Sequence, residues 1–525
     1  MKFSRIFLIE NKKVKIALKV LYIYQELLML KDTQNKIIAF IDSNKDYPLI
    51  AAIASGLFPI LYYYNSNLTL INSWDQFLFF ILFFLVFPII GFRIAYFTFS
   101  KIGILKAYKK YCLPVLNFTY SAFLIVIITF GFQEKIILFT AVFIAIILAL
   151  VLYKHLNKII VFQFLMAILT LVLLIIYMSS LTNPSDWMVH SDNIEQVVMK
   201  KKPNIYLIQP DGYANSSEIG KGYYQFDNSK FDNYLIQNNF KIYSDYRSNY
   251  YSTLSSNSSM FAMKHHYYNY PTGKIREVYN TRDVIAGDNS VIRILKNNSY
   301  KTFSILEKSY LLINRPKIFY DYCNIDFSEI TYFSRGFQVS KNTKEDFKQA
   351  FSENKETHNF FFIEKIKPGH ITNRKFPGKI ASNEREKYLG KIKEANVWLK
   401  DILDFIINND SNALIIIAAD HGGFVGMNTT LESREKQTDR DLIQSIFTSQ
   451  LAIKWPNDVS GLEQDIRTPV NLFRIIFSVL SDDESFLKNQ QDDKSYIQIN
   501  KGAPFGVYEY INEEGEIVFN RVLKE

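Results

Sequence analysis

Two apolar runs end in an acidic residue followed by glycine. Residues 204–209 (NIYLIQ) and Pro210 lead into Asp211-Gly212, and residues 414–419 (LIIIAA) lead into Asp420-His421-Gly422. An acid at the tip of a buried strand projects where ligands bind, and the glycine lets the chain turn sharply. Oxygen and nitrogen ligands suit Zn, Mn or Mg, so Asp211, Asp420 and His421 are candidates for one divalent cation site. Aspartate is also a common turn residue, and loop chemistry explains either strand end taken alone.

A third candidate element is rich in hydroxyl groups. Residues 248–260 (SNYYSTLSSNSSM) follow an expected strand at residues 240–246. A hydroxyl attacks phosphorus or sulfur only once its proton is lost, and a dication achieves this without a neighbouring general base. Thr253 is the candidate nucleophile. A polar loop with a helix cap explains the same composition.

The elements that position these residues read as an α/β domain. Expected strands cover residues 204–209, 301–306, 359–363, 414–419 and 450–455, and expected helices cover residues 231–238, 384–408 and 470–480. Such alternation favours a mostly parallel central sheet with helices on both faces. Ligands bound to such a sheet gather at the carboxyl ends of its strands.

The first third of the chain is a different kind of sequence. A bilayer core of roughly 30 Å needs about 20 apolar residues in a helix, and five stretches qualify: residues 47–64, 77–99, 112–132, 136–153 and 159–178. We therefore expect a five-span transmembrane domain at residues 47–178. A basic cytoplasmic segment at residues 1–46 precedes it, with an interfacial helix at residues 16–30. A linker at residues 179–202 and an extracytoplasmic domain at residues 203–525 follow.

Charge follows the same division. The first 178 residues hold 17 Lys/Arg against 7 Asp/Glu, whereas the remainder holds 43 against 44. The basic excess lies beside membrane segments, so it gives no reason to expect a nucleic-acid partner. The connections between spans are alternately rich and poor in Lys and Arg, and the rich ones stay in the cytoplasm. With an odd number of spans, the last domain therefore lies outside, in the periplasm or at the cell exterior. The expected location is a bacterial plasma (inner) membrane.

The chain resembles the sulfatase-like branch of the alkaline phosphatase superfamily. The resemblance lies in PNIYLIQPDGYA at residues 203–214, the hydroxyl cluster, LIIIAADHGG at residues 414–423 and TPVNLFRIIF at residues 468–477. Within that branch the sequence is similar to polytopic membrane proteins, namely lipoteichoic acid synthases and phosphoethanolamine transferases. The resemblance implies an alkaline-phosphatase-like α/β fold. It also implies that Asp211, Thr253, Asp420 and His421 hold one cation, and that Thr253 becomes phosphorylated.

Some features depart from that family. True sulfatases carry a Cys-x-Pro-x-Arg sequence, and neither Cys112 nor Cys323 stands in such a setting, so sulfate-ester hydrolysis is disfavoured. Relatives often have a His-x-Pro-Phe/Tyr turn where this chain has Lys-Pro-Gly-His370-Ile. His370 is a candidate for binding the head group or protonating a leaving oxygen. His265 and His266 are candidates for lining the pocket, with structural roles as the alternative.

The sequence thus predicts a membrane-anchored, metal-dependent phospho-group transferase of the phosphoglycerol or phosphoethanolamine type. It would use one divalent ion, with Zn or Mn favoured and Mg also compatible. The donor would be a membrane phospholipid and the acceptor a cell-envelope glycan or lipid. Two alternatives stay open: a phosphodiester or phosphomonoester hydrolase with the same residues, and a non-catalytic sulfatase-like envelope-assembly protein.

Overall fold

The computed structural model describes residues 31–132, 134–181, 185–266, 280–373, 381–459 and 465–523. The predicted interfacial helix at residues 16–30 lies outside these residues. The chain divides into two compact units. The first comprises the residues up to Leu68 together with Trp74–Ser179, and the second comprises Thr69–Ser73 and Ser180–Glu525.

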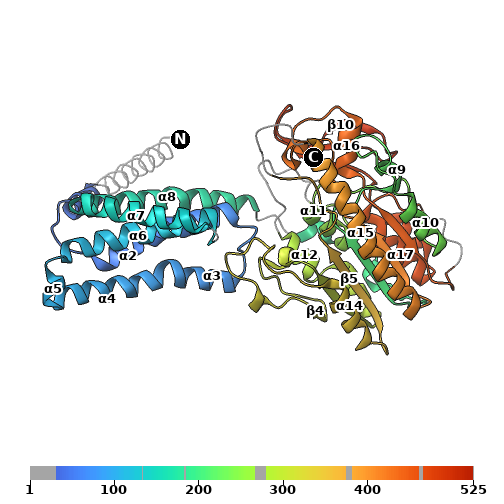
Figure 1. The fold of residues 1–525 in the computed structure, drawn as a ribbon, viewed down its shortest axis with the longest axis horizontal. Coiled ribbons are helices and arrows are strands. Elements are labelled where there is room, and N and C mark those ends of the chain that lie inside the picture. Colours follow the sequence, from blue (N-terminus) through green and yellow to red (C-terminus); the bar gives the residue numbers. More distant parts are fainter. Residues whose placement is uncertain are drawn as a thin grey trace, which may run out of the picture. The chain divides into compact units, whose positions relative to one another are not determined.

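The first unit is entirely helical (Figure 1). Its helices are α2 (Pro48–Asn67), α3 (Trp74–Ile81), α4 (Phe87–Lys101), α5 (Gly103–Lys106), α6 (Lys109–Phe130), α7 (Lys135–Leu152) and α8 (Leu156–Leu181). Among the described residues, four helical runs are long and apolar enough to cross a membrane: Pro48–Asn67, Trp74–Lys101, Lys109–Phe130 and Lys135–Ser179. The last run is 45 residues long and contains two of the predicted spans, so the structure counts four such helices where the sequence predicts five.

A short 3₁₀ turn (Tyr153–His155) divides that last run into α7 and α8. The end of α7 lies beside the start of α6, where the rings of Tyr111 and Tyr153 are 4.8 Å apart. In α8, Gln163 exchanges two amide hydrogen bonds of 3.0 Å with Asn117, which is further along α6. Paired amides satisfy polar groups that an apolar bundle would otherwise leave unbonded.

The second unit is built on a seven-stranded sheet with the order β2-β7-β6-β1-β5-β3-β4. The strands are β1 (Ile205–Pro210), β2 (Lys241–Ile242), β3 (Tyr300–Leu306), β4 (Tyr322–Cys323), β5 (His358–Lys365), β6 (Leu414–Ala418) and β7 (Leu451–Lys454). Strands β6, β1, β5, β3 and β4 run parallel to one another, and β7 is antiparallel to both of its neighbours. The predicted mostly parallel α/β sheet is therefore confirmed.

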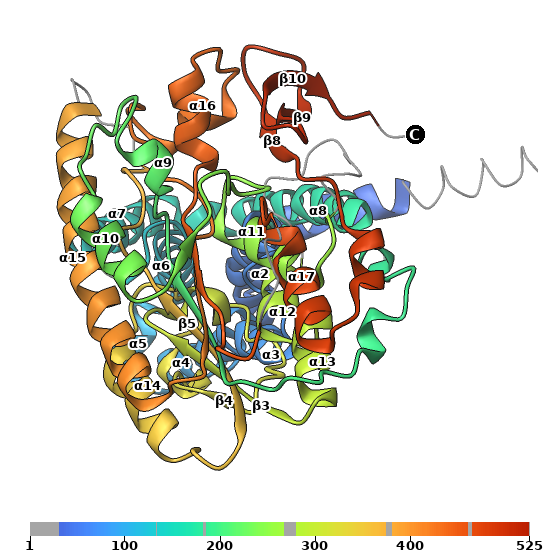
Figure 2. The same ribbon diagram turned by 90° about the vertical axis from the view of Figure 1, so that its right-hand side faces the viewer.

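Both faces of this sheet are buried, because its strands are nearly continuous apolar runs. Tyr206 and Ile208 of β1 face one cluster, which also contains residues of α10 (Ser229–Gln237), α14 (Thr343–Ser352) and α15 (Ala381–Asn409). Ile205 and Leu207 face the other, with residues of α11 (Thr253–Ala262), α12 (Thr281–Ala286), α13 (Ser290–Asn297) and α17 (Pro469–Ser481). Figure 2 shows α10 and α15 on one side of the sheet and α11, α13 and α17 on the other.

Two features of this unit differ from the sequence prediction. The strand expected at residues 240–246 is only two residues long, because Ser244 and Asp245 form a turn. A separate antiparallel sheet was not predicted; it consists of β8 (Ser495–Ile499), β9 (Gly506–Ile511) and β10 (Ile517–Arg521). The short helices α9 (Ser216–Ile219) and α16 (Arg440–Phe447) complete the unit.

Candidate metal centre

The two predicted acidic strand ends are neighbours in space. Strands β1 and β6 pair in parallel with Ile208 opposite Ile417, so Asp211 and Asp420 leave the sheet at the same level. The backbone N–H of Gly212 donates a 3.0 Å hydrogen bond to Oδ1 of Asp420, which ties the two strand ends together. Parallel strands thus bring together two acids that are 209 positions apart in the chain.

Gly212 is required at this turn by its backbone and by its surroundings. Its φ is +67°, a backbone conformation that residues other than glycine rarely adopt. A Cβ at this position would lie 2.2 Å from the carbonyl oxygen of Gly369. The N–H of Gly369 in turn donates a 2.7 Å hydrogen bond to the carbonyl oxygen of Asp211. The loops that follow β1 and β5 are therefore packed backbone to backbone beneath Asp211.

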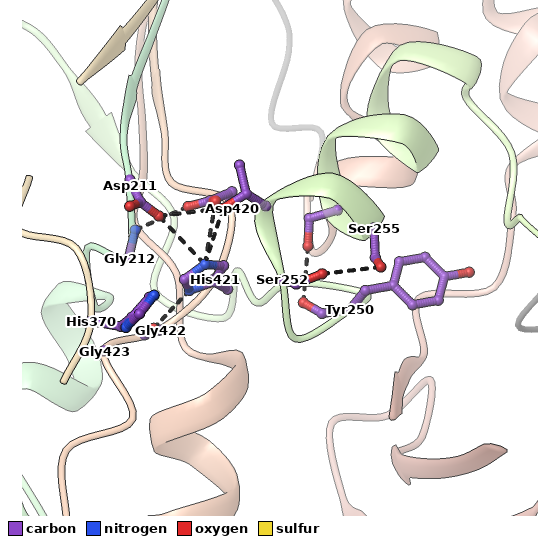
Figure 3. Close-up of polar contacts among 12 residues, drawn as sticks. Asp211, Gly212, Tyr250, Ser252, Ser255, His370, Asp420, His421, Gly422 and Gly423 are labelled. Atoms are coloured by element: carbon purple, nitrogen blue, oxygen red, sulfur yellow. Dashed lines mark hydrogen bonds and ion pairs between the residues drawn. The ribbon is translucent and has the colours of Figure 1, made fainter. Parts of the chain in front are cut away.

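Asp211, Asp420 and His421 converge on one point. One ligand atom from each lies within 4.8 Å of the others, and all three residues are buried. Nε2 of His421 is 3.4 Å from Oδ1 of Asp211 and 3.5 Å from Oδ2 of Asp420. Figure 3 shows the three side chains pointing toward one another. The convergence expected from the sequence is present in the structure.

Thr253 lies at the same point. Its Oγ1 is 3.5 Å from Oδ1 of Asp211 and 3.4 Å from Nε2 of His421. Thr253 is the first residue of α11, where unpaired N–H groups and the helix dipole favour negative charge. Ser256 fixes this start, because its hydroxyl donates a 2.9 Å hydrogen bond to the carbonyl oxygen of Tyr250. The hydroxyl cluster is thus a helix that presents Thr253 to the three candidate ligands.

The donor set fits a divalent cation. Nδ1 of His421 is 2.8 Å from the carbonyl oxygen of Gly422, so an Nδ1–H tautomer turns the Nε2 lone pair toward the acids. Oδ2 of Asp420 is buried without a hydrogen-bond partner among the described residues. A buried carboxylate oxygen without a donor is costly, and a cation at this point removes that cost.

Electrostatics point the same way. Burial, together with the nearby Asp420 carboxylate, raises the pKa of Asp211 to about 7. Burial acts to lower the pKa of His421, but the carboxylates of Asp420 and Asp211 outweigh it and raise this pKa above its usual value. Repulsion between two buried negative charges favours a proton on Asp211, and attraction to the carboxylates favours a proton on His421; a bound dication would compete with both protons.

A cavity of about 460 Å³ opens onto this cluster. Asp211, Thr253 and His421 line it, and so does His370, whose ring centre is 6.0 Å from that of His421. The structure therefore brings His370 to the site. The other described residues that line the cavity are Tyr251, Ser252, Tyr310, Phe337, Ile366, Gly369, Asn373, Lys391, Phe424, Thr430, Leu431 and Arg434.

The structure does not bring His265 and His266 to this cavity, contrary to the sequence prediction. His265 is buried between the hydroxyl of Tyr250, 2.9 Å from its Nδ1, and the carbonyl oxygen of Asp492, 2.8 Å from its Nε2. The ring of His266 stacks on that of Tyr250 with centres 3.9 Å apart. Both residues are buried and contact Tyr250, and His265 also contacts Asp492 and Tyr496 of the C-terminal part of the unit, so their role is structural.

Several cavity residues were not singled out from the sequence. Lys391 lies on the long helix α15 and Arg434 on the 3₁₀ turn Thr430–Arg434. Tyr310 lies on the 3₁₀ turn Ser309–Leu312 after β3, and Phe337 lies on the connection between β4 and α14. Their sequence surroundings carry no distinguishing pattern. Only the fold brings them to the carboxyl edge of the sheet.

Comparison with known proteins finds similarity only at the level of structure. No protein-family model and no curated protein sequence matches the chain. Similar solved structures include the lipoteichoic acid synthase LtaP from Listeria monocytogenes (13% identity, TM-score 0.39), covering 62% of this chain and 91% of that one. The C-terminal periplasmic domain of EptC from Escherichia coli in complex with Zn has 11% identity and a TM-score of 0.39, covering 60% and 93%.

A third similar structure is the soluble domain of lipooligosaccharide phosphoethanolamine transferase A from Neisseria meningitidis. It has 11% identity and a TM-score of 0.35, covering 55% of this chain and 92% of that one.

Proposed function

We propose that the protein is a membrane-anchored, metal-dependent phospho-group transferase of the sulfatase-like branch of the alkaline phosphatase superfamily. One observation carries the proposal. The hydroxyl of Thr253 lies 3.5 Å and 3.4 Å from two members of a buried Asp-Asp-His cluster, at the base of an open cavity. A hydroxyl so placed is positioned to become a nucleophile.

Asp211, Thr253, Asp420 and His421 would hold one divalent cation, with Zn or Mn favoured and Mg compatible. When bound, the ion lowers the pKa of the threonine hydroxyl and neutralises charge on the reacting phosphate. The chain itself supplies the orientation. The hydrogen bonds from Gly212 to Asp420 and between His421 and Gly422 fix the ligand atoms before substrate arrives.

The reaction proceeds in two displacements. Oγ1 of Thr253 forms a bond to the phosphorus of a lipid phosphodiester, the bond from phosphorus to the diacylglycerol oxygen breaks, and that oxygen takes up the proton that Thr253 has lost. His370 lines the cavity and is the candidate carrier of that proton. The head group is then held as a phospho-threonine ester. An acceptor hydroxyl from a cell-envelope glycan or lipid displaces Thr253 and restores it.

We further propose that the helical unit crosses the membrane five times. Supporting this, Tyr153 at the end of α7 contacts Tyr111 at the start of α6, while Gln163 of α8 contacts Asn117 further along α6. The chain thus reverses at the 3₁₀ turn, and α7 and α8 count as separate spans. The predicted boundaries, with the metal centre outside a bacterial plasma membrane, follow from this count and from the Lys/Arg distribution.

The test is the pair Thr253→Ala and Thr253→Ser in the full chain reconstituted into phospholipid vesicles. We expect Thr253→Ala to abolish release of diacylglycerol, and Thr253→Ser, which keeps a hydroxyl at the same point, to retain measurable activity. Transfer of the head group to an added glycan or lipid acceptor, against release of free phosphate compounds, separates a transferase from a hydrolase. Full activity in Thr253→Ala would refute the nucleophile, and equal loss in both variants would point to a structural threonine.

A further inference from the structure

The cavity above the metal centre has an uneven distribution of charge. Among the described residues that line it, the acidic group is Asp211, which faces the cation site, and the cations beyond that site are Lys391 and Arg434. As far as the structure describes it, the wall away from the metal centre therefore offers positive charge and hydroxyl or amide groups, and no carboxylate.

Lys391 is free to meet a substrate. It lies on α15, is exposed, and makes no ion pair with any residue that the structure describes. The acids nearest to it along the same helix already have partners: Glu384 pairs with Lys387 at 2.8 Å, and Glu394 pairs with Lys367. The ammonium group of Lys391 thus lines the cavity without a direct ion-pair partner among the described residues, and the carboxylates of Glu384 and Glu394 act on it only from a distance.

Arg434 is held in place but is not satisfied. Its Nη2 donates to the side-chain oxygen of Gln498, whereas its Nε is buried with no hydrogen-bond partner among the described residues. A guanidinium has five N–H donors and no acceptor. Arg434 therefore adds a second positive charge to the cavity wall, held in place through Gln498.

Three of the aromatic side chains in the wall, Tyr310, Phe337 and Phe424, already contact other rings or a cation. Tyr310 stacks against Phe337 with ring centres 5.4 Å apart, and the guanidinium of Arg282 lies 4.9 Å from the centre of the Tyr310 ring. The Tyr310 ring, which could otherwise bind a substrate ammonium group, thus already has a cation beside it. Phe424 is similarly engaged, with ring centres 5.5 Å from His421 and 6.0 Å from His370.

From this distribution of charge we infer that the cavity selects a head group without a cationic amine. It fits the phosphate ester of an uncharged polyol, such as glycerol phosphate, and disfavours ethanolamine phosphate. This inference rests on the proposed function. Lys391 is a specificity-determining residue, because it would repel an ammonium group in the cavity and donate hydrogen bonds to a polyol. A discrimination of about tenfold corresponds to about 1.4 kcal/mol, in the range expected for two like charges several ångströms apart near a protein surface.

The experiment compares two donors with the full chain in vesicles, supplied with Mn²⁺ or Zn²⁺. Phosphatidylglycerol and phosphatidylethanolamine are each diluted into phosphatidylcholine, and diacylglycerol release is measured. We expect kcat/KM for phosphatidylglycerol to exceed that for phosphatidylethanolamine by at least about tenfold. We expect Lys391→Glu to reduce this ratio by about the same factor.

Lys393→Glu is the matched control. It lies on the same helix and makes the same change of charge, but its ammonium group lies near the ring of Phe226 and does not line the cavity. It controls for attraction of the enzyme to anionic vesicles, and we expect it to leave the donor ratio unchanged. Equal use of the two donors, preference for phosphatidylethanolamine, or equal effects of the two variants would overturn the inference alone. Release from neither donor would overturn the proposed function as well.

Discussion

Replacing Asp420 by asparagine separates the proposed metal-binding role of this residue from its structural role. Oδ1 of Asp420 accepts a hydrogen bond from the N–H of Gly212, and an asparagine oxygen can accept the same bond. What changes is Oδ2, a buried atom without a hydrogen-bond partner in the part of the chain that the structure describes. Asp420→Asn therefore keeps the shape of the turn and removes one negative ligand.

The metal-free variant should be at least as stable as the metal-free wild type. The pKa of Asp211 is raised to about 7 in the folded protein. Stability is therefore lost as pH rises from the pKa of an unfolded-state aspartate toward 7, and the loss amounts to about 4 kcal/mol at pH 8. Burial is the larger cause and remains in the variant, whereas the repulsion from Asp420 is lost. We expect Asp420→Asn to gain about 1 to 2 kcal/mol of unfolding free energy at pH 8 without metal.

With metal the order should reverse. A bound ion stabilises the fold by RT ln(1 + [L]/Kd), which is about 2.7 kcal/mol at one hundred times Kd. Loss of a ligand should weaken binding at least about 100-fold, the upper range seen when residues supporting a ligand are removed. At the same metal concentration, metal binding then stabilises the variant by only about 0.4 kcal/mol.

The assay is chemical denaturation of the full chain in detergent at pH 8, with EDTA and with Mn²⁺ or Zn²⁺, together with metal content by mass spectrometry. Asp420→Asn should unfold later than wild type in EDTA and earlier in metal. A variant that is less stable than wild type in EDTA, or that keeps the full response to metal, would refute the reasoning.

Three other substitutions test the surroundings of the site. Gly212→Ala should lower the unfolding free energy by about 2 kcal/mol or more, because the φ of Gly212 is +67° and the added Cβ would lie 2.2 Å from the carbonyl oxygen of Gly369. The control is Gly390→Ala on α15, which has open space around it and should cost nothing. Burial lowers the pKa of His265 to about 4, so stability present above pH 6.5 should fall by about 2 to 3 kcal/mol on going to pH 4.5, and His265→Gln should flatten that dependence. Glu364→Met should raise unfolding free energy by about 1 to 2 kcal/mol, because both carboxyl oxygens are buried without partners among the described residues. Denaturation curves measure all three; a harmless Gly212→Ala, an unchanged pH profile or a destabilised Glu364→Met would contradict the respective argument.

The convergence of Asp211 and Asp420 could be predicted from sequence because strand ends obey a simple rule. Strands buried on both faces read as uninterrupted apolar runs, and the residues that end them in a parallel sheet share one edge. Asp211 and Asp420 satisfy that rule directly. Thr253 needed the resemblance as well, since a hydroxyl-rich segment alone fits a loop equally well.

The helix that carries Thr253 shows why the rest was harder. Small polar residues fill most of α11, and its serines are buried, several of them bonded to the backbone of the helix itself. Its composition therefore hides both its secondary structure and its burial. His265 and His266 follow directly after this helix, and their direction depends on Tyr250 and Asp492, contacts that no local pattern contains.

The cavity wall was beyond prediction for a related reason. Lys391 belongs to a helix of 29 residues with many other charged positions, and only the packing of α15 against the sheet distinguishes it from them. The β8–β10 sheet does leave a sequence signal, because residues 506–511 and 517–521 are short β-type runs separated by Asn512-Glu513-Glu514-Gly515-Glu516. That pattern is typical of a hairpin.

Mass spectrometry of the peptide from Ser248 to Lys264 tests the central claim most directly. The full chain, loaded with metal, is exposed to donor lipid, quenched in acid and digested with trypsin. The account predicts a covalent phospho-adduct on Thr253, whose mass names the head group and which is absent from Thr253→Ala and from Asp420→Asn. Turnover of lipid without any adduct on this peptide, or an adduct that persists in Thr253→Ala, would contradict it.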